Sequence, residues 1–158
     1  PSTLYAGTQM GVYKSTDSGA SWNPSYGGWV AEPVEILEID PQFPLILYSA
    51  RGGLVMRTID GGGYWVAANY GNLGAISAIE VDPQNFGTLY VGTYGDGVSR
   101  SMNFGETWVS INKGLDSYYI YSLAIDPEAP NRLHAGTEGD GIFLVEQGPE
   151  LYLPLVSR

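Results

Sequence analysis

The sequence predicts an all-β chain made of about four copies of one four-stranded antiparallel unit. Four landmarks recur at spacings of 42 to 44 residues, and a fixed period of this size is typical of repeat architectures. The 22 Gly and 10 Pro among 158 residues favour short strands joined by tight turns. No helical apolar stripe is visible. Four antiparallel strands per period are typical of a β-propeller blade.

The first strand of each unit is an apolar alternation that ends at an Asp-Pro pair. These pairs are Asp40-Pro41, Asp82-Pro83 and Asp126-Pro127. Proline stops a strand because it lacks the N–H that the sheet needs. We interpret the three aspartates as turn residues that cap the strand ends.

The second and third strands form a hairpin around a glycine turn. A Leu-Tyr-x-Gly-Thr pattern at 4–8 returns, with substitutions, at 47–50, 89–93 and 133–137. Gly95-Asp96-Gly97 and Gly139-Asp140-Gly141 follow two of these runs, and glycine reaches positive φ easily. The third strand ends in the Ser or Thr of a repeated box, and we expect the fourth strand to start at the Trp of that box.

The box has the pattern Ser/Thr-x-Asp/Asn-x-Gly-x-x-Trp. We expect the acid or amide to accept backbone N–H bonds, the hydroxyl to bond back across the hairpin, and the Trp to cover the turn. A box present in successive units cannot mark a single active centre, so we assign it a structural role. Its residues are Ser15, Asp17, Gly19 and Trp22; Thr58, Asp60, Gly62 and Trp65; and Ser101, Asn103, Gly105 and Trp108.

The phase of the box divides residues 1–158, a single domain, into blades at about 1–33, 34–75, 76–118 and 119–158. The first blade begins at its second strand, so it lacks the inner strand, and the tally is 15 strands. The box of the last blade is degenerate, with Leu151 at the Trp position. Residues 151–156 then form either the fourth strand of their own blade or a strand donated to a neighbour.

These boxes resemble the Asp-box (BNR) repeat propellers, and the resemblance covers essentially the whole chain. That family includes sialidases, xyloglucan-active glycoside hydrolases, sortilin-type receptor domains and photosystem assembly factors. The resemblance implies a propeller and a location outside the cytoplasm, but the fold does not choose among these functions. Full rings in the family usually need six or more blades, and this chain supplies just under four. Asn103 and the degenerate fourth box depart from the pattern.

Composition excludes several classes of partner. The net charge of −10 argues against nucleic acid and against an anionic membrane surface, because both are bound through Lys and Arg. No apolar run is long enough for membrane insertion. The absence of cysteine and the single histidine, His134, argue against thiolate and multi-histidine metal sites. Calcium at the Gly-Asp-Gly turns is an alternative, but we predict no metal and no cofactor.

No catalytic set converges in the sequence. A sialidase-like site needs an arginine cluster, yet Lys14, Arg57 and Arg100 recur one per blade just before the box, which we interpret as a blade-surface feature. No pair of carboxylates stands out among the 17 acids as a glycosidase would require. We therefore predict that the chain is not an enzyme.

Ligand-binding candidates lie on the loops at the end opposite the boxes. Variable loops on a rigid scaffold commonly carry function, and aromatic residues beside carboxylates suit a sugar or a protein partner. The alternative is that these aromatics simply pack between blades. The candidates are Tyr26, Trp29, Tyr70, Tyr94, Asp96, Tyr118, Tyr119, Glu138 and Asp140.

The sequence thus favours a non-catalytic structural or binding module that is extracellular or at the cell surface. We expect it to complete its fold or to form a surface assembly or filament, through self-association or through neighbouring blades of a longer parent chain. A protein or a polysaccharide is a further candidate partner. The alternative function is part of a glycoside hydrolase or carbohydrate-binding propeller acting on β-glucans.

Overall fold

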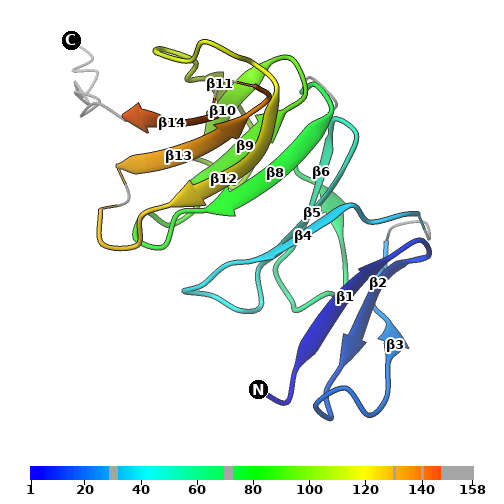
Figure 1. The fold of residues 1–158 in the computed structure, drawn as a ribbon. Helices are drawn as coiled ribbons and strands as arrows, with labels where there is room; N and C mark the ends of the chain where they lie inside the picture. Colours follow the sequence, from blue (N-terminus) through cyan, green and yellow to red (C-terminus); the bar gives the residue numbers. More distant parts are fainter. Residues whose placement is uncertain (29–31, 70–72, 130, 140, 147–158) are drawn as a thin grey trace, which may run out of the picture.

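The computed structural model describes residues 1–28, 32–69, 73–129, 131–139 and 141–146. This part of the chain contains no helix, and so none that could span a membrane. Figure 1 shows its strands fanned out in successive sheets. The strands are β1 (Leu4–Thr8), β2 (Gly11–Ser15), β3 (Asn23–Pro24), β4 (Ile36–Ile39), β5 (Leu47–Arg51), β6 (Leu54–Thr58), β7 (Val66–Ala67), β8 (Ile76–Val81), β9 (Leu89–Thr93), β10 (Gly97–Ser101), β11 (Val109–Ser110), β12 (Ile120–Ile125), β13 (Arg132–Thr137) and β14 (Gly141–Glu146).

Four antiparallel sheets follow one another along the chain, which confirms the predicted all-β propeller arrangement. Their strand orders are β1-β2-β3, β4-β5-β6-β7, β8-β9-β10-β11 and β12-β13-β14. We number them blades 1 to 4. Blade 1 lacks an inner strand as predicted, and β1 pairs only with β2 among the described strands. The fifteenth strand, expected at 151–156, lies outside the described residues.

The blades stack face to face, with one apolar cluster between each neighbouring pair. We call the face of a blade that meets the next blade its forward face, and the opposite one its backward face. Val12 on the forward face of blade 1 packs with Met56 and Trp65 of blade 2. Val98 of blade 3 packs in the same way with Leu133 and Val145 of blade 4. Alternation along each strand therefore serves two interfaces at once.

Small residues let the inner strands approach. A Cβ added to Gly92 on β9 would lie 2.5 Å from Cγ2 of Ile120, and one on Gly7 would lie 2.6 Å from Cγ1 of Val34. Ala50 holds the same place in blade 2, opposite Val55. A larger side chain at this position would push the next blade away.

The fourth strands are shorter than expected. β3, β7 and β11 have two residues each and begin one residue after the Trp of the box. The prediction that these strands start at the Trp was therefore wrong by one residue. The shift does not depend on the indole, because the Trp108 indole N–H donates to the Gly105 carbonyl whereas that of Trp65 donates to the Ser25 carbonyl, both at 2.8 Å.

The three boxes make the same local hydrogen bonds. The Gly19 N–H donates to Ser15 Oγ at 2.8 Å, Ser15 Oγ donates to Asp17 Oδ1 at 2.8 Å, and the Ser21 N–H donates to the same Oδ1 at 2.8 Å. The bonds recur at Thr58 and Asp60 and at Ser101 and Asn103. The hydroxyl thus bonds inside its own turn, which corrects the expectation that it crosses the hairpin.

Two consecutive residues of each box adopt positive φ. The predicted glycine does so in all three boxes, with φ of 93° at Gly19 and 88° at Gly62 and Gly105. The residue before it does so as well, at 60° for Ser18 and Phe104 and 71° for Gly61. Non-glycine residues are strained there, and the hydroxyl and carboxylate bonds hold the turn in that shape.

Candidate functional site at the loop end

Two ends of the blade stack are distinct. At the loop end, the Tyr94 N–H donates to the Ala75 carbonyl at 2.8 Å and Tyr94 forms a β-bridge with Tyr119. At the box end, the Gly61 N–H donates to the Leu45 carbonyl at 2.8 Å, which ties the box to the Asp-Pro turn. The predicted candidates therefore belong to the end that carries the connections between blades.

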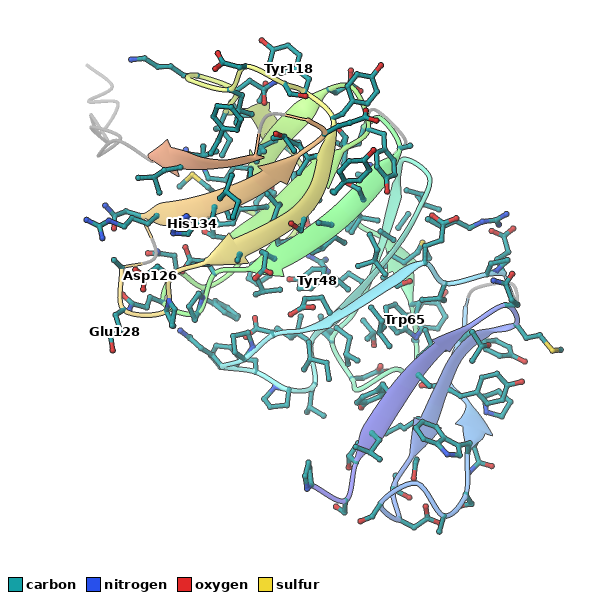
Figure 2. All side chains as sticks on the ribbon, in the orientation of Figure 1. Tyr48, Trp65, Tyr118, Asp126, Glu128 and His134 are labelled. Atoms are coloured by element: carbon teal, nitrogen blue, oxygen red, sulfur yellow. The ribbon has the colours of Figure 1, made fainter. Side chains whose placement is uncertain are left out.

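Three predicted tyrosines gather at the loop end of blades 3 and 4. Tyr94, Tyr118 and Tyr119 are each about half exposed, and Tyr118 lies at the upper edge of the molecule in Figure 2. The backbone ties their two loops together, because the N–H groups of Gly95 and Gly97 both donate to the Tyr118 carbonyl at 3.0 Å. We call this group of exposed rings the tyrosine platform, because aromatic side chains lose little conformational entropy on contact with a ligand.

Tyr121 joins this platform and was missed by sequence reasoning. Its ring centroid lies 5.5 Å from that of Tyr94 in an edge-to-face arrangement, and it is also about half exposed. A hydrogen bond to the Glu138 carboxylate raises the pKa of Tyr121. Tyr121 follows the buried Ile120 directly in β12. Successive side chains of a strand point to opposite faces, so the sequence could have predicted that the Tyr121 side chain faces outward.

The other predicted site residues do not join the platform. Tyr26 belongs to blade 1, where its ring packs edge-on against Tyr13 at a centroid distance of 6.5 Å. Asp96 sits at the β9–β10 turn, where its carbonyl accepts the side-chain amide of Asn112 at 2.8 Å. Trp29, Tyr70 and Asp140 lie outside the described residues.

Asp96 lines a groove between blades 2 and 3 with a volume of about 590 Å³. Asn69, Leu73, Ser99, Thr107 and Trp108 contribute to its walls. Asn69 is not free to bind, because its side-chain carbonyl accepts the Val55 N–H at 2.6 Å and its amide donates to the Gly53 carbonyl at 2.9 Å. The groove has a mixed polar and apolar lining with two acids, Asp96 and Glu106, and the Glu106 carboxylate lies 3.7 Å from the Arg57 guanidinium.

Two glutamates occupy the same position on successive inner strands. Glu38 on β4 pairs with Tyr48, and Glu80 on β8 pairs with Tyr90. Burial raises the pKa of Glu38, and burial together with the Glu38 charge raises the pKa of Glu80 to about 7. These two glutamates were not related to each other from the sequence, and their shared register with Tyr48 and Tyr90 was the signal available for it.

The box end carries an apolar groove that was not predicted. Phe43, Phe86 and Phe104 pack in a row, with centroid distances of 4.4 and 4.8 Å. The exposed side chains of Leu45 and Ile59 extend the groove, which has a volume of about 520 Å³. The signal was weak, because the phenylalanines hold different places in their turns: Phe43 lies three residues after Asp40, Phe86 lies four residues after Asp82, and Phe104 lies inside the third box.

Two of the three periodic cations, Lys14 and Arg57, use their places on the blade surface to connect neighbouring blades. Lys14 Nζ donates to the Gly61 carbonyl at 2.8 Å and lies over the Tyr5 ring. An Nη of Arg57 donates to the Phe104 carbonyl at 3.2 Å, and the guanidinium lies over that ring. Each cation thus satisfies a carbonyl in the box of the next blade.

No three His, Asp or Glu side chains among the described residues gather closely enough to hold a metal ion. The acids that end the inner strands are committed to turns, since Asp40 Oδ1 accepts the N–H groups of Gln42 and Phe43 at 2.8 and 2.9 Å. Asp82 and Asp126 do the same. These arrangements are structural.

Solved structures with a similar fold are β-propeller proteins. An ancestral GH74 enzyme has a TM-score of 0.73 at 20% identity over 91% of this chain and 21% of its own. The GH74 xyloglucanase from Xanthomonas campestris has 0.70 at 19% identity, covering 92% and 27%. YCF48 bound to D1 peptide has 0.66 at 15% identity, covering 92% and 48%. The chain therefore spans about a fifth to a half of the lengths of these proteins.

No protein-family profile and no curated protein sequence matches the chain. At 15 to 20% identity, the structural likeness defines the fold alone. The class supported is a β-propeller arrangement of about four blades.

Proposed function

We propose that this chain is a non-catalytic, extracellular structural and binding module of the Asp-box type, whose end blades take up further propeller blades. These blades belong to another chain or to a longer parent chain. The extracellular location rests on the resemblance of the three boxes to Asp-box propellers.

The observation that carries the proposal is the forward face of blade 4. Val12, Val55 and Val98 stand opposite Gly7, Ala50 and Gly92, and all three valines are 0% exposed. Ile142 stands opposite Gly136 at the corresponding place on blade 4 and is 77% exposed. Blade 4 therefore keeps the large apolar side chain, Ile142, and the small residue opposite it, Gly136. In the other blades the residues at these two positions pack against the following blade.

The backward face of blade 1 is open in the matching way. Trp65 of blade 2 is 1% exposed, and its indole N–H donates to the Ser25 carbonyl of blade 1 at 2.8 Å. Figure 2 shows it between the first two blades. Trp22 holds the same place in its box but is 41% exposed. Open apolar faces of this kind mark interaction sites.

A tandem chain tests the proposal. A Gly/Ser linker between two copies holds blade 4 of one copy close to blade 1 of the other. Because their effective concentration is then high, the two blades can come into contact even if separate chains bind each other weakly. We expect a higher Tm than for the single chain and weaker binding of a dye that reports exposed apolar surface. Equal Tm and equal dye binding per copy would contradict the proposal.

A second function is a carbohydrate-binding or glycoside hydrolase propeller acting on β-glucans. The tyrosine platform favours it, because sugar rings stack on exposed aromatic faces and Glu138 lies beside them. The likeness to two GH74 proteins is consistent with it.

Affinity electrophoresis in gels containing a neutral β-glucan separates the two functions. Retardation that is lost in Tyr119→Ala and kept in Tyr64→Ala, an equally exposed tyrosine of the second box, would favour a carbohydrate site. Release of reducing sugar would establish hydrolysis. We expect neither retardation nor hydrolysis.

A further inference from the structure

We infer that the partner of each open face is a second copy of this chain, with the forward face of blade 4 packed on the backward face of blade 1 of the other copy. This inference rests on the proposed function, since it names the source of the further blades. The two open faces are the two halves of an interface that the chain already makes three times.

The internal interface between blades 1 and 2 shows which residues would meet. There Val12 packs with Met56 and Trp65. Tyr13 stands at the Met56 position, since it lies opposite Ala6 as Met56 lies opposite Ser49. Ile142 of one copy would therefore contact Tyr13 and Trp22 of the other.

The shapes of the two faces agree with this assignment. The backward face of blade 1 has a hollow of about 420 Å³ with almost entirely apolar walls. It is lined by Ala6, Thr8, Gln9, Met10, Tyr13 and Trp22. On blade 4, Ile142 and Leu144 project from β14 and are both exposed. A branched apolar side chain facing an aromatic hollow gives burial on both sides.

One departure from the repeat changes the chemistry of the contact. Lys14 and Arg57 bond to carbonyls of the next box, but Leu144 holds their place in blade 4 and carries no donor. The contact between copies is therefore more apolar than the contacts inside the chain. Each copy carries a net charge of −10, so like-charge repulsion opposes it. Added salt screens that repulsion and should strengthen association.

A contact between two different faces builds a closed ring when the rotation per copy closes and an open filament when it does not. Propellers have roughly four to eight blades. Two copies with four blades each reach the upper end of this range, whereas three copies exceed it. We therefore expect a closed pair of chains with twice the 17.0 kDa mass of one chain.

The test measures mass by light scattering across a wide concentration range in low and high salt. We expect the pair to form in the native chain and to be favoured by salt. Ile142→Lys should weaken association at least about tenfold, as should Tyr13→Lys. Ile59→Lys is the matched control, since Ile59 is equally exposed but lies at the box end. Met10→Lys, at the rim of the hollow, replaces Tyr13→Lys if that variant does not fold.

Mixing the two variants is the decisive experiment. Ile142→Lys keeps an intact blade 1 and Tyr13→Lys keeps an intact blade 4, so the mixture should form an open 1:1 pair although each variant alone stays a monomer. No pair in the mixture, or association unaffected by both substitutions, would overturn the inference. A native chain that stays monomeric while the tandem chain gains stability would overturn it too, yet leave the proposed function standing.

Discussion

Trp65 and Trp22 hold the same place in two copies of the same box, but one is 1% and the other 41% exposed. The hydrogen bonds of the two boxes match within a few tenths of an ångström. The difference comes from the neighbour: blade 1 covers Trp65, and no blade in the described chain covers Trp22. In a stack of repeats, the local geometry of a repeat depends on its own sequence, whereas the burial of its side chains depends on its position in the stack.

The largest expected difference in the loss of stability is therefore between substitutions of the two tryptophans. Trp65→Ala should lower the free energy of unfolding by about 3–5 kcal/mol, because it leaves a cavity between blades 1 and 2. Trp22→Ala should cost only about 1 kcal/mol in a monomer, because water already reaches that side chain. Urea denaturation in the Ile142→Lys background excludes any contribution from association. Equal losses would contradict the idea that position in the stack decides the energetics.

The box hydroxyls should show no such contrast. Ser15 and Thr58 are both essentially fully buried, although only the second box faces a preceding blade. Ser15→Ala and Thr58→Val each remove the acceptor for a glycine N–H, and we expect losses of about 1–3 kcal/mol that agree with each other. Denaturation midpoints measure both. A much smaller loss for Ser15→Ala would show that the box also depends on its neighbour.

The inner strands should make stability depend on pH. Glu80 keeps its proton in the folded chain up to about pH 7, whereas in the unfolded chain it ionises near 4.5. Stability should therefore fall as pH rises between these values. Since Glu80 is only half-buried, we expect a loss of about 1–2 kcal/mol. Glu80→Gln should remove this loss, and Glu38→Gln should reduce it by removing a neighbouring charge. If the free energy of unfolding falls just as steeply with pH in Glu80→Gln, the pH dependence arises from another group.

The smallest effect is expected for the acid of the second box. Asn103 already replaces it in the third box, and its Oδ1 accepts the Thr107 N–H at 2.9 Å as Asp60 accepts the Tyr64 N–H at 3.0 Å. Asp60→Asn should therefore change stability at neutral pH by less than about 0.5 kcal/mol. Asp60→Ala, which removes the acceptor, should cost more. Thermal unfolding of the two variants side by side checks this order.

The loop end was partly predictable from the sequence. Tyr94, Tyr118 and Tyr119 were chosen because variable connections carry them, and the structure brings these three together. Tyr26 was chosen for the same reason but packs in its own blade. Tyr121 was not chosen, because it lies in a strand. A rule based on loops could not find a strand residue whose side chain faces outward beside them.

The sequence by itself determined what repeats. The period of the box predicted the blades, the missing inner strand, and the acid and glycine roles in each turn, because these depend on bonds between residues close along the chain. Only the tertiary structure decided which copies are covered. Ile142 and Val98 have equivalent partners in their own sheets but opposite exposure, because burial depends on a neighbouring blade that no local pattern encodes.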